Sequence, residues 1–240
     1  MAKRSILSGR FLGGLDSKCD NPLDIDSGSA CPAGKNEAIN KTNRLVGGIG
    51  TNNNEYPSKR DGKLIKEYNL WKAMLHRCAE KCWNEYPTYV GTTCSENFKN
   101  YSYFYEWCQS QVGFGNIDEK GNCWHLDKDL LTKGNKVYSE DACVFIPARI
   151  NTLLTKCNTK RGELPIGVCW YNITETFMAQ CHNGSGNQKN LGYFDTLEEA
   201  FQAYKIFKEA LIKRVAHDYC TQLDPRAYQA LLNYQVEVTD

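Results

Sequence analysis

The feature that most constrains this chain is the close succession of a strand, a turn, a second strand and a helix between residues 125 and 154. Residues 126–131 interleave apolar and charged side chains, and Gly134-Asn135, within Lys133–Lys136, is a strong turn pair. Residues 144–146 form a β-branched and aromatic run, and Pro147 follows where a helix can begin. Apolar residues then recur at helical spacing, at Ile150, Leu153 and Leu154. The pattern predicts a tight β-hairpin with a helix packed back over it.

Polar side chains recur along the first strand of this hairpin. Residues two apart on a strand share a face, so we expect His125, Asp127 and Asp129 to point the same way. We expect Asn151, on the helix, to reach the same spot. A carboxylate, an imidazole and an amide can hold one hard cation such as Mg²⁺ while water fills the other positions. The competing interpretation is a solvent-exposed hairpin, which is the commoner fate of an Asp-Lys-Asp strand followed by Gly-Asn.

The stretch LDKDLLTKGNKVYSEDACVFIPARIN, residues 126–151, resembles the divergent HNH nuclease core of many phage and mobile-element proteins. An upstream WKxMLxRC helix, which those proteins also carry, is matched by Trp71, Lys72, Met74, Leu75, Arg77 and Cys78. The resemblance implies a ββα-metal fold that binds Mg²⁺ or Mn²⁺ through Asp127 and Asn151, with Asp129 as a further candidate ligand.

Two positions depart from the HNH pattern. Lys128 stands where the family has its water-activating histidine, and the central asparagine of the motif falls near Asp141-Ala142. His125 is therefore a candidate general base or second metal ligand. Lys128 is the alternative base if its pKa is lowered, and otherwise a phosphate contact.

The C-terminal part has its own pattern. Residues 164–171, 176–182 and 190–194 are predicted strands, and Thr196 to Glu199 is a capping box that begins a helix. This helix carries one apolar stripe, at Leu197, Ala200, Phe201, Tyr204, Phe207, Leu211 and Val215. The sequence predicts a three-stranded antiparallel sheet covered by one helix, followed by a short last helix at Asp224-Pro225.

The residues GVCWYNITETFMAQC and NLGYFDTLEEAFQAY resemble the plant-type AP-two/ERF DNA-binding domain, which also occurs fused to phage HNH nucleases. In that family the sheet lies in the major groove and contacts bases through Arg and Trp. Arginine is nearly absent from these strands, so that mode of base recognition does not transfer. The candidate DNA-binding residues are Trp170, Tyr171, Gln180, His182 and Lys189, together with Lys160 and Arg161 of the linker at 155–163. The alternative is a sheet that faces a protein partner.

Charge and cysteine content bear on the partners. The net charge is only +1, which is weak support for a nucleic-acid binder, although a local basic patch is compatible with it. An amphipathic helix predicted over 67–84 places Cys78 and Cys82 on its apolar face, where they are expected to be buried small side chains. The competing interpretation is a structural zinc site that combines Cys78 and Cys94 with either Cys123 or Cys143.

The twelve cysteines are expected to be reduced, because the N-terminus lacks the apolar core of a signal peptide. No run approaches the ~20 apolar residues of a membrane span, so we expect no membrane partner and a cytoplasmic location, in a bacterial host if the protein is phage-encoded.

These observations predict an α+β protein with four parts: a loop-rich arm (1–60), an HNH-like core (61–155), an AP-two/ERF-like domain (164–216) and a C-terminal helix and tail (217–240). The expected function is metal-dependent hydrolysis of phosphodiesters in double-stranded DNA, as a homing-type endonuclease. The alternative is a catalytically decayed DNA-binding or protein-interaction module of phage origin.

Overall fold

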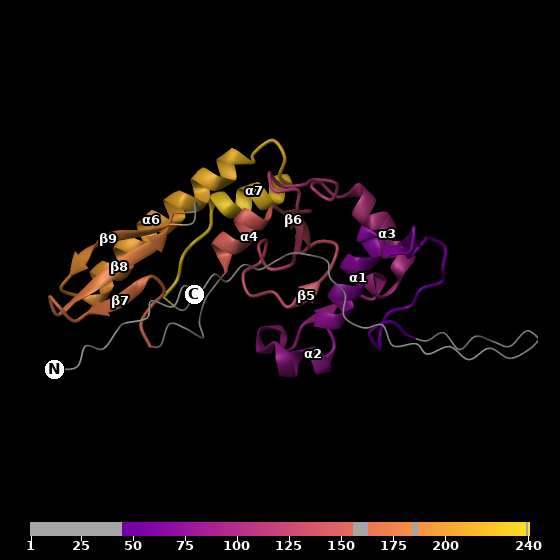
Figure 1. Cartoon of the computed structure of the whole chain (residues 1–240), viewed down its shortest axis with the longest axis horizontal. Helices are drawn as coiled ribbons and strands as arrows, with labels where there is room; N and C mark the ends of the chain where they lie inside the picture. The colour runs from indigo at the N-terminus through magenta and orange to yellow at the C-terminus, as the bar shows by residue number, and fades with distance from the viewer. Residues whose placement is uncertain (1–44, 156–162, 184–186, 239) are drawn as a thin grey trace, which may run out of the picture. The chain divides into compact units, whose positions relative to one another are not determined.

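A computed structural model describes residues 45–155, 163–183, 187–238 and 240 (Figure 1). Helices and short strands alternate along this part of the chain, which has the mixed α+β character that the sequence predicted. The first half contains, in order, β1 (Lys59–Arg60), β2 (Lys63–Leu64), α1 (Lys66–Arg77), α2 (Glu80–Glu85), the 3₁₀ turn η1 (Pro87–Tyr89), β3 (Thr93–Cys94), the 3₁₀ turn η2 (Asn97–Lys99) and α3 (Tyr101–Ser110).

The single helix predicted over 67–84 is wrong, because α1 ends at Arg77 and a separate helix, α2, begins at Glu80. Ala79 between them has extended backbone, with φ −89° and ψ 134°. The indole Nε1 of Trp83 donates to the Arg77 carbonyl at 3.0 Å, and this bond satisfies one of the acceptors that the end of α1 leaves open. A side-chain hydrogen bond therefore stabilises the break between α1 and α2.

In the sequence, Tyr101, Phe104 and Tyr105 stand at the i, i+3, i+4 spacing of one helix face, which favours a buried aromatic helix, and α3 packs as core. Tyr101 and Phe104 are fully buried, and Trp107 packs against the same cluster. Asn100 is the N-cap, and its side chain accepts from the backbone amides of Ser102 and Tyr103. α1 contacts α3, so these two helices form one side of the larger core.

The predicted hairpin exists, but its connection is different. β4 (His125–Asp127) pairs antiparallel with β6 (Val144–Ile146), and α4 (Ala148–Leu154) follows with Pro147 as its N-cap. A turn does form at 132–135, where the amide of Asn135 donates to the Thr132 carbonyl at 3.0 Å. The strand after that turn, β5 (Val137–Tyr138), instead runs parallel to β3.

The prediction of a tight hairpin at 133–136 is therefore wrong, and residues 128–143 form a longer loop between β4 and β6. Burial explains the outcome. The pairing of β5 with β3 carries Tyr138 into the larger core, where it is 3% exposed. A direct hairpin at 133–136 would not use this distant partner strand.

The C-terminal sheet has the predicted antiparallel order, with β7 (Val168–Tyr171), β8 (Thr176–His182) and β9 (Gln188–Phe194), and α6 (Leu197–Asp218) packs on it. The first strand begins four residues later than predicted, because Gly167 turns the chain with φ +81° against the ring of Tyr204. A Cβ at Gly167 would lie 2.0 Å from that ring. The Thr196 hydroxyl accepts from the Glu199 amide at 3.3 Å, which confirms the threonine half of the predicted capping box.

The long helix α6 contributes to two cores. Its first half packs Ala200, Phe201 and Tyr204 against the sheet. Its second half adds Leu211, Ile212 and Val215 to the larger core, where α7 (Pro225–Leu232) also packs. The Asp224 side chain accepts from the Arg226 amide at 2.8 Å, so the predicted Asp-Pro start of the last helix is confirmed. One helix thus connects the hairpin region and the three-stranded sheet.

Candidate functional site

The strand β4 presents His125 and Asp127 on one face and buries Leu126 on the other. Its partner β6 is buried at all three positions, Val144, Phe145 and Ile146. The hairpin is therefore fixed by its apolar side, and this leaves the two polar side chains on the opposite side, partly exposed.

The helix α4 completes this side of the hairpin. Ile150 and Leu153 are buried in the larger core and fix the rotation of the helix. The side-chain Nδ2 of Asn151 consequently lies 2.9 Å from Nδ1 of His125. The structure thus brings together two of the predicted site residues, from a strand and a helix that are 26 positions apart in the sequence.

Asp127 ends the strand through its own carboxylate. Its Oδ1 accepts from the backbone amides of Asp129 at 3.0 Å and Leu130 at 2.8 Å. Burial, and next the charge of Asp129, raise the pKa of the Asp127 carboxyl, while these two amides act in the opposite direction. The local environment of the Asp127 carboxylate therefore disfavours its charged form.

Asp129 does not share the face of His125 and Asp127, and this prediction is corrected. The strand ends before it, because the turn closed by the Asp127 carboxylate redirects the chain at residue 128. The Asp129 side chain is half exposed, and its Oδ2 lies 3.6 Å from the Lys128 ammonium.

Lys128 is buried, with only 8% of the residue exposed. Its ammonium lies 5.8 Å from the centre of the Tyr138 ring as well as near Asp129. A buried lysine is uncommon unless it is paired. The partly exposed Asp129 and the face of Tyr138 supply that pairing here.

Arg77, at the end of α1, is a residue of this site that the hairpin pattern did not reveal. Its guanidinium donates to the hydroxyl of Tyr138 at 3.3 Å and lies 5.6 Å from the ring of Tyr89. Within the described parts of the chain, no carboxylate lies within 4.0 Å of it. The signal that marks it in the sequence is its place in the WKxMLxRC helix.

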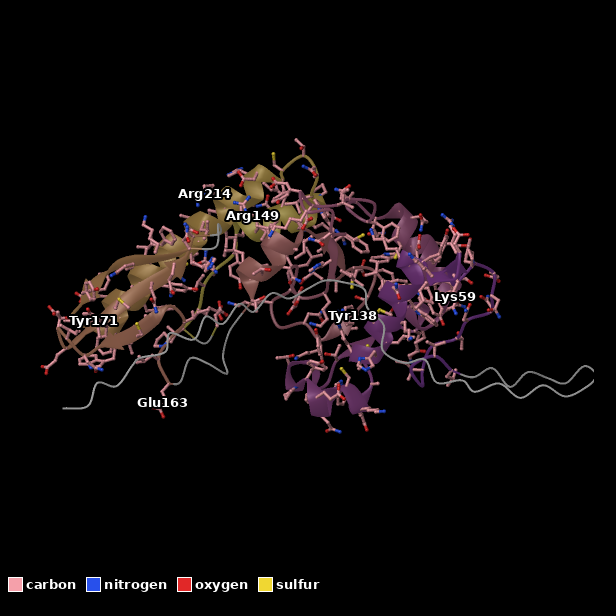
Figure 2. The ribbon with its side chains drawn as sticks, viewed as in Figure 1. Lys59, Tyr138, Arg149, Glu163, Tyr171 and Arg214 are labelled. Carbon is pink, nitrogen blue, oxygen red and sulfur yellow. The ribbon has the colours of Figure 1, made fainter. Side chains whose placement is uncertain are left out.

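The positive charge of Arg77 acts on the pKa of the His125 imidazole. Burial, and next the charge of Arg77, lower the pKa of His125 below 6.5, while Asp118 acts in the opposite direction. A lowered pKa favours the neutral ring at neutral pH. Arg77 donates to the hydroxyl of Tyr138 and the Lys128 ammonium lies over the ring of the same tyrosine, so two cations lie beside the hairpin. Figure 2 labels Tyr138.

Cys78 is near two other cysteines of the predicted zinc site, Cys94 and Cys143. The thiols of Cys78 and Cys94 lie close enough to interact, and this interaction raises the pKa of Cys78 and lowers that of Cys94. Cys143 is near enough to affect Cys78, and burial raises the pKa of the Cys143 thiol to about 12. Among the described residues, no three His, Cys, Asp or Glu side chains form a group able to hold a metal by themselves. The zinc site stays a prediction.

The predicted DNA-binding residues divide between the two faces of the C-terminal sheet. Trp170 lies two residues after the buried Val168, so both side chains are on the face that carries α6. The ring centres of Trp170 and Phe177 are 5.0 Å apart on this face. Lys189 lies opposite the buried Cys181, and its ammonium is 5.0 Å from the Phe207 ring of α6. Both residues therefore lie on the helix side of the sheet.

The remaining three, Tyr171, Gln180 and His182, lie on the open face of the sheet, away from α6. Tyr171 packs against Tyr193 at 4.9 Å between ring centres, and the Gln180 amide donates to the Cys169 thiol sulfur at 3.5 Å. Figure 2 labels Tyr171 on β7. Strand alternation leaves no lysine or arginine of these three strands on the open face. Lys160 and Arg161 lie outside the described residues.

No protein-family model, no curated protein and no solved structure matches this chain. No helix in the described ranges has both the length and the apolar content needed to cross a bilayer.

Proposed function

We propose that the chain is a metal-dependent DNA endonuclease of the HNH homing type, with β4, β6 and α4 as a ββα-metal-like unit. The observation that supports this most is the 2.9 Å contact between His125 and Asn151, with Asp127 on the same face of the strand. A strand and a helix here bring an imidazole, an amide and a carboxylate to one edge of a hairpin.

The side chains present fit a hard divalent cation. Asp127 uses Oδ1 for two backbone amides, which leaves Oδ2 for a metal. Asn151 supplies a neutral ligand through its amide oxygen. Asp129 fits less well, because it is turned toward Lys128. Bound Mg²⁺ or Mn²⁺ would supply charge stabilisation at the scissile phosphate.

The histidine is suited to proton transfer. Its lowered pKa keeps the ring neutral at neutral pH, so a nitrogen lone pair is available to take a proton from water. The Asn151 Nδ2 that lies on His125 Nδ1 donates to it, so a base at Nε2 requires the amide turned over, with its oxygen accepting from Nδ1–H. In either orientation the amide holds the ring in place. His125 is therefore the proposed base in place of Lys128.

The two cations beside the hairpin suit a phosphate. Arg77 has no carboxylate partner within 4.0 Å among the described residues, and its guanidinium can bind a phosphate through two parallel hydrogen bonds. Lys128 is held near Asp129 and Tyr138 and adds a second positive charge. We assign both to binding the scissile phosphate.

The three-stranded sheet with α6 is the proposed AP-two/ERF-like DNA-docking unit. Gln180 and His182 carry donors and acceptors that suit base edges, and Tyr171 adds an apolar ring on the same face. Trp170 and Lys189 are not part of this surface, because they lie on the helix side.

The test is cleavage of duplex DNA by the purified chain with Mg²⁺ or Mn²⁺. The parent and Asp129→Asn should cut, whereas Asp127→Asn and His125→Gln should be at least ~100-fold slower, which corresponds to the loss of a catalytic group. Asp129→Asn is the matched control, because it removes the same charge two residues away on an exposed side chain. Equal cutting by the parent and Asp127→Asn would refute the assignment.

A second candidate function is a DNA-binding or protein-interaction module without catalysis. The observation that favours it is the buried Lys128 beside Asp129, at the position where the HNH family has its histidine. A parent that binds duplex DNA with strong salt dependence and never cuts it would support this candidate. A parent that binds no duplex at low salt would favour a protein partner. For either function we propose the host cytoplasm as the location.

A further inference from the structure

A cavity separate from the hairpin site opens at the N-terminal end of α1. Its volume is about 310 Å³, and its lining includes Arg60, Lys63, Lys66, Glu67 and Tyr105. The hairpin of β1 and β2 supplies the first two of these residues, the first turn of α1 the next two, and α3 the tyrosine. Three cations and one carboxylate therefore surround this space.

The β1–β2 hairpin fixes two of these cations side by side. Its two-residue turn, Asp61-Gly62, has φ values of +52° and +77°, as a type I′ turn requires. Arg60 is paired directly with Lys63 across the strands, so the two side chains project from the same face. Like charges in this position repel each other, and no carboxylate of the described residues lies within 4.0 Å of either. An anion bound between them would remove that repulsion.

The other walls of the cavity are fixed as well. The ring of Tyr105 is stacked on Tyr56, with ring centres 4.1 Å apart and planes inclined by 12°. The Lys66 ammonium donates to the Phe114 carbonyl, which holds its charge in place. The single acid, Glu67, accepts from the Gln109 amide at 2.9 Å. The cavity is thus preformed.

The N-terminus of α1 adds donors at the same place. Its N-cap residue is Ile65, which has no side-chain oxygen, so no capping side chain occupies the first-turn amides. These amides and the helix dipole favour an anion. This contribution adds to that of the paired cations and does not carry the assignment alone.

DNA binding needs cations that the open face of the C-terminal sheet lacks. Phosphate neutralisation supplies much of the affinity of a protein for duplex DNA, yet the open face of β7, β8 and β9 carries no lysine or arginine. We propose that the cavity lined by Arg60 and Lys63 binds a backbone phosphate of the same duplex. This inference rests on the proposed function and gives it an additional contact.

The helix α1 sets the spacing between this cavity and the hairpin site. Lys66 begins the helix at the cavity, and Arg77 ends it beside Tyr138. A helix of 12 residues spans roughly 17 Å at 1.5 Å per residue. The two contacted phosphates should therefore lie roughly 17 Å apart.

The test is the salt dependence of duplex binding by the full chain and three single variants. Arg60→Gln and Lys63→Gln should each weaken binding and reduce the slope of log K against log salt by up to ~0.9, the value for one phosphate contact. Lys59→Gln is the matched control. Lys59 belongs to the same hairpin and is exposed, but it is paired with Leu64 and projects from the opposite face. It carries a label in Figure 2.

The outcomes separate this inference from the proposed function. If the parent binds duplex DNA and the two cavity variants match Lys59→Gln in affinity and slope, the cavity assignment is wrong and the proposed function stands. If the parent binds no duplex at low salt, both are wrong. Each variant should keep the melting temperature of the parent, because all three side chains are exposed.

Discussion

Asparagine and alanine at position 127 should affect stability and metal binding differently. The Asp127 carboxylate accepts two backbone amide hydrogen bonds and is also the proposed metal ligand. Asparagine keeps an oxygen for the two amides, whereas alanine leaves both without an acceptor. We expect Asp127→Ala to lower the free energy of unfolding by ~1–2 kcal/mol, the usual cost of losing such a cap.

Asp127→Asn should leave the stability of the metal-free protein unchanged or raise it. The folded-state pKa of Asp127 is raised, so the carboxyl contributes most to stability below its unfolded pKa of 3.8 and loses that contribution as the pH rises through the folded value. At neutral pH the parent therefore carries the cost of a desolvated charge, and asparagine removes it.

With metal bound, the parent should become more stable than Asp127→Asn. At a Mg²⁺ or Mn²⁺ concentration ten times the dissociation constant, binding stabilises the parent by ~1.4 kcal/mol. For a chain of this size that is a rise in melting temperature of roughly 3–5 °C. Differential scanning calorimetry with and without metal should show this rise for the parent and for neither variant. A metal-dependent rise in Asp127→Asn, or a metal-free loss as large as in Asp127→Ala, would refute the reasoning.

Three further results are expected. Because the pKa of His125 is lowered in the folded state, the unfolded chain takes up this proton first, and the free energy of unfolding should fall as the pH drops through about 6.5. Urea midpoints of His125→Gln should fall less over the same pH range than those of the parent. Gln180→Ala should lose ~1–3 kcal/mol of discrimination at one base pair in a selection from random duplexes, whereas Trp170→Ala should keep the parent's preference, because that ring lies on the other face. Gly167→Ala should cost at least ~2 kcal/mol in chemical denaturation, since its Cβ would overlap Tyr204 and its φ is positive; unchanged stability would contradict that packing.

Local signals in the sequence predicted local structure well. The Thr196 cap, the Asp224-Pro225 helix start and the buried aromatic residues of α3 all depend on a few neighbouring residues, and the structure contains each of them. The contact of His125 with Asn151 was expected for a similar reason, because β4, β6 and α4 all lie within residues 125–154.

Features set by distant partners could not be predicted in this way. The turn at 132–135 forms, but β5 pairs with β3, which lies more than 40 residues earlier in the chain. The break after Arg77 depends on a bond from the indole of Trp83, and the place of Arg77 beside Tyr138 depends on where β5 packs. The face occupied by Trp170 follows from the strand register, which the aromatic pattern alone does not fix.

The most direct test of the metal site is a Mn²⁺ titration of the isotope-labelled protein followed by NMR. The paramagnetic ion broadens the signals of the nuclei nearest to it. The proposed site predicts that the backbone amides of Asp129 and Leu130 and the side-chain amide of Asn151 broaden first, and that Asp127→Asn abolishes the effect. Broadening centred on another part of the chain, or unchanged broadening in Asp127→Asn, would contradict a metal site at this hairpin.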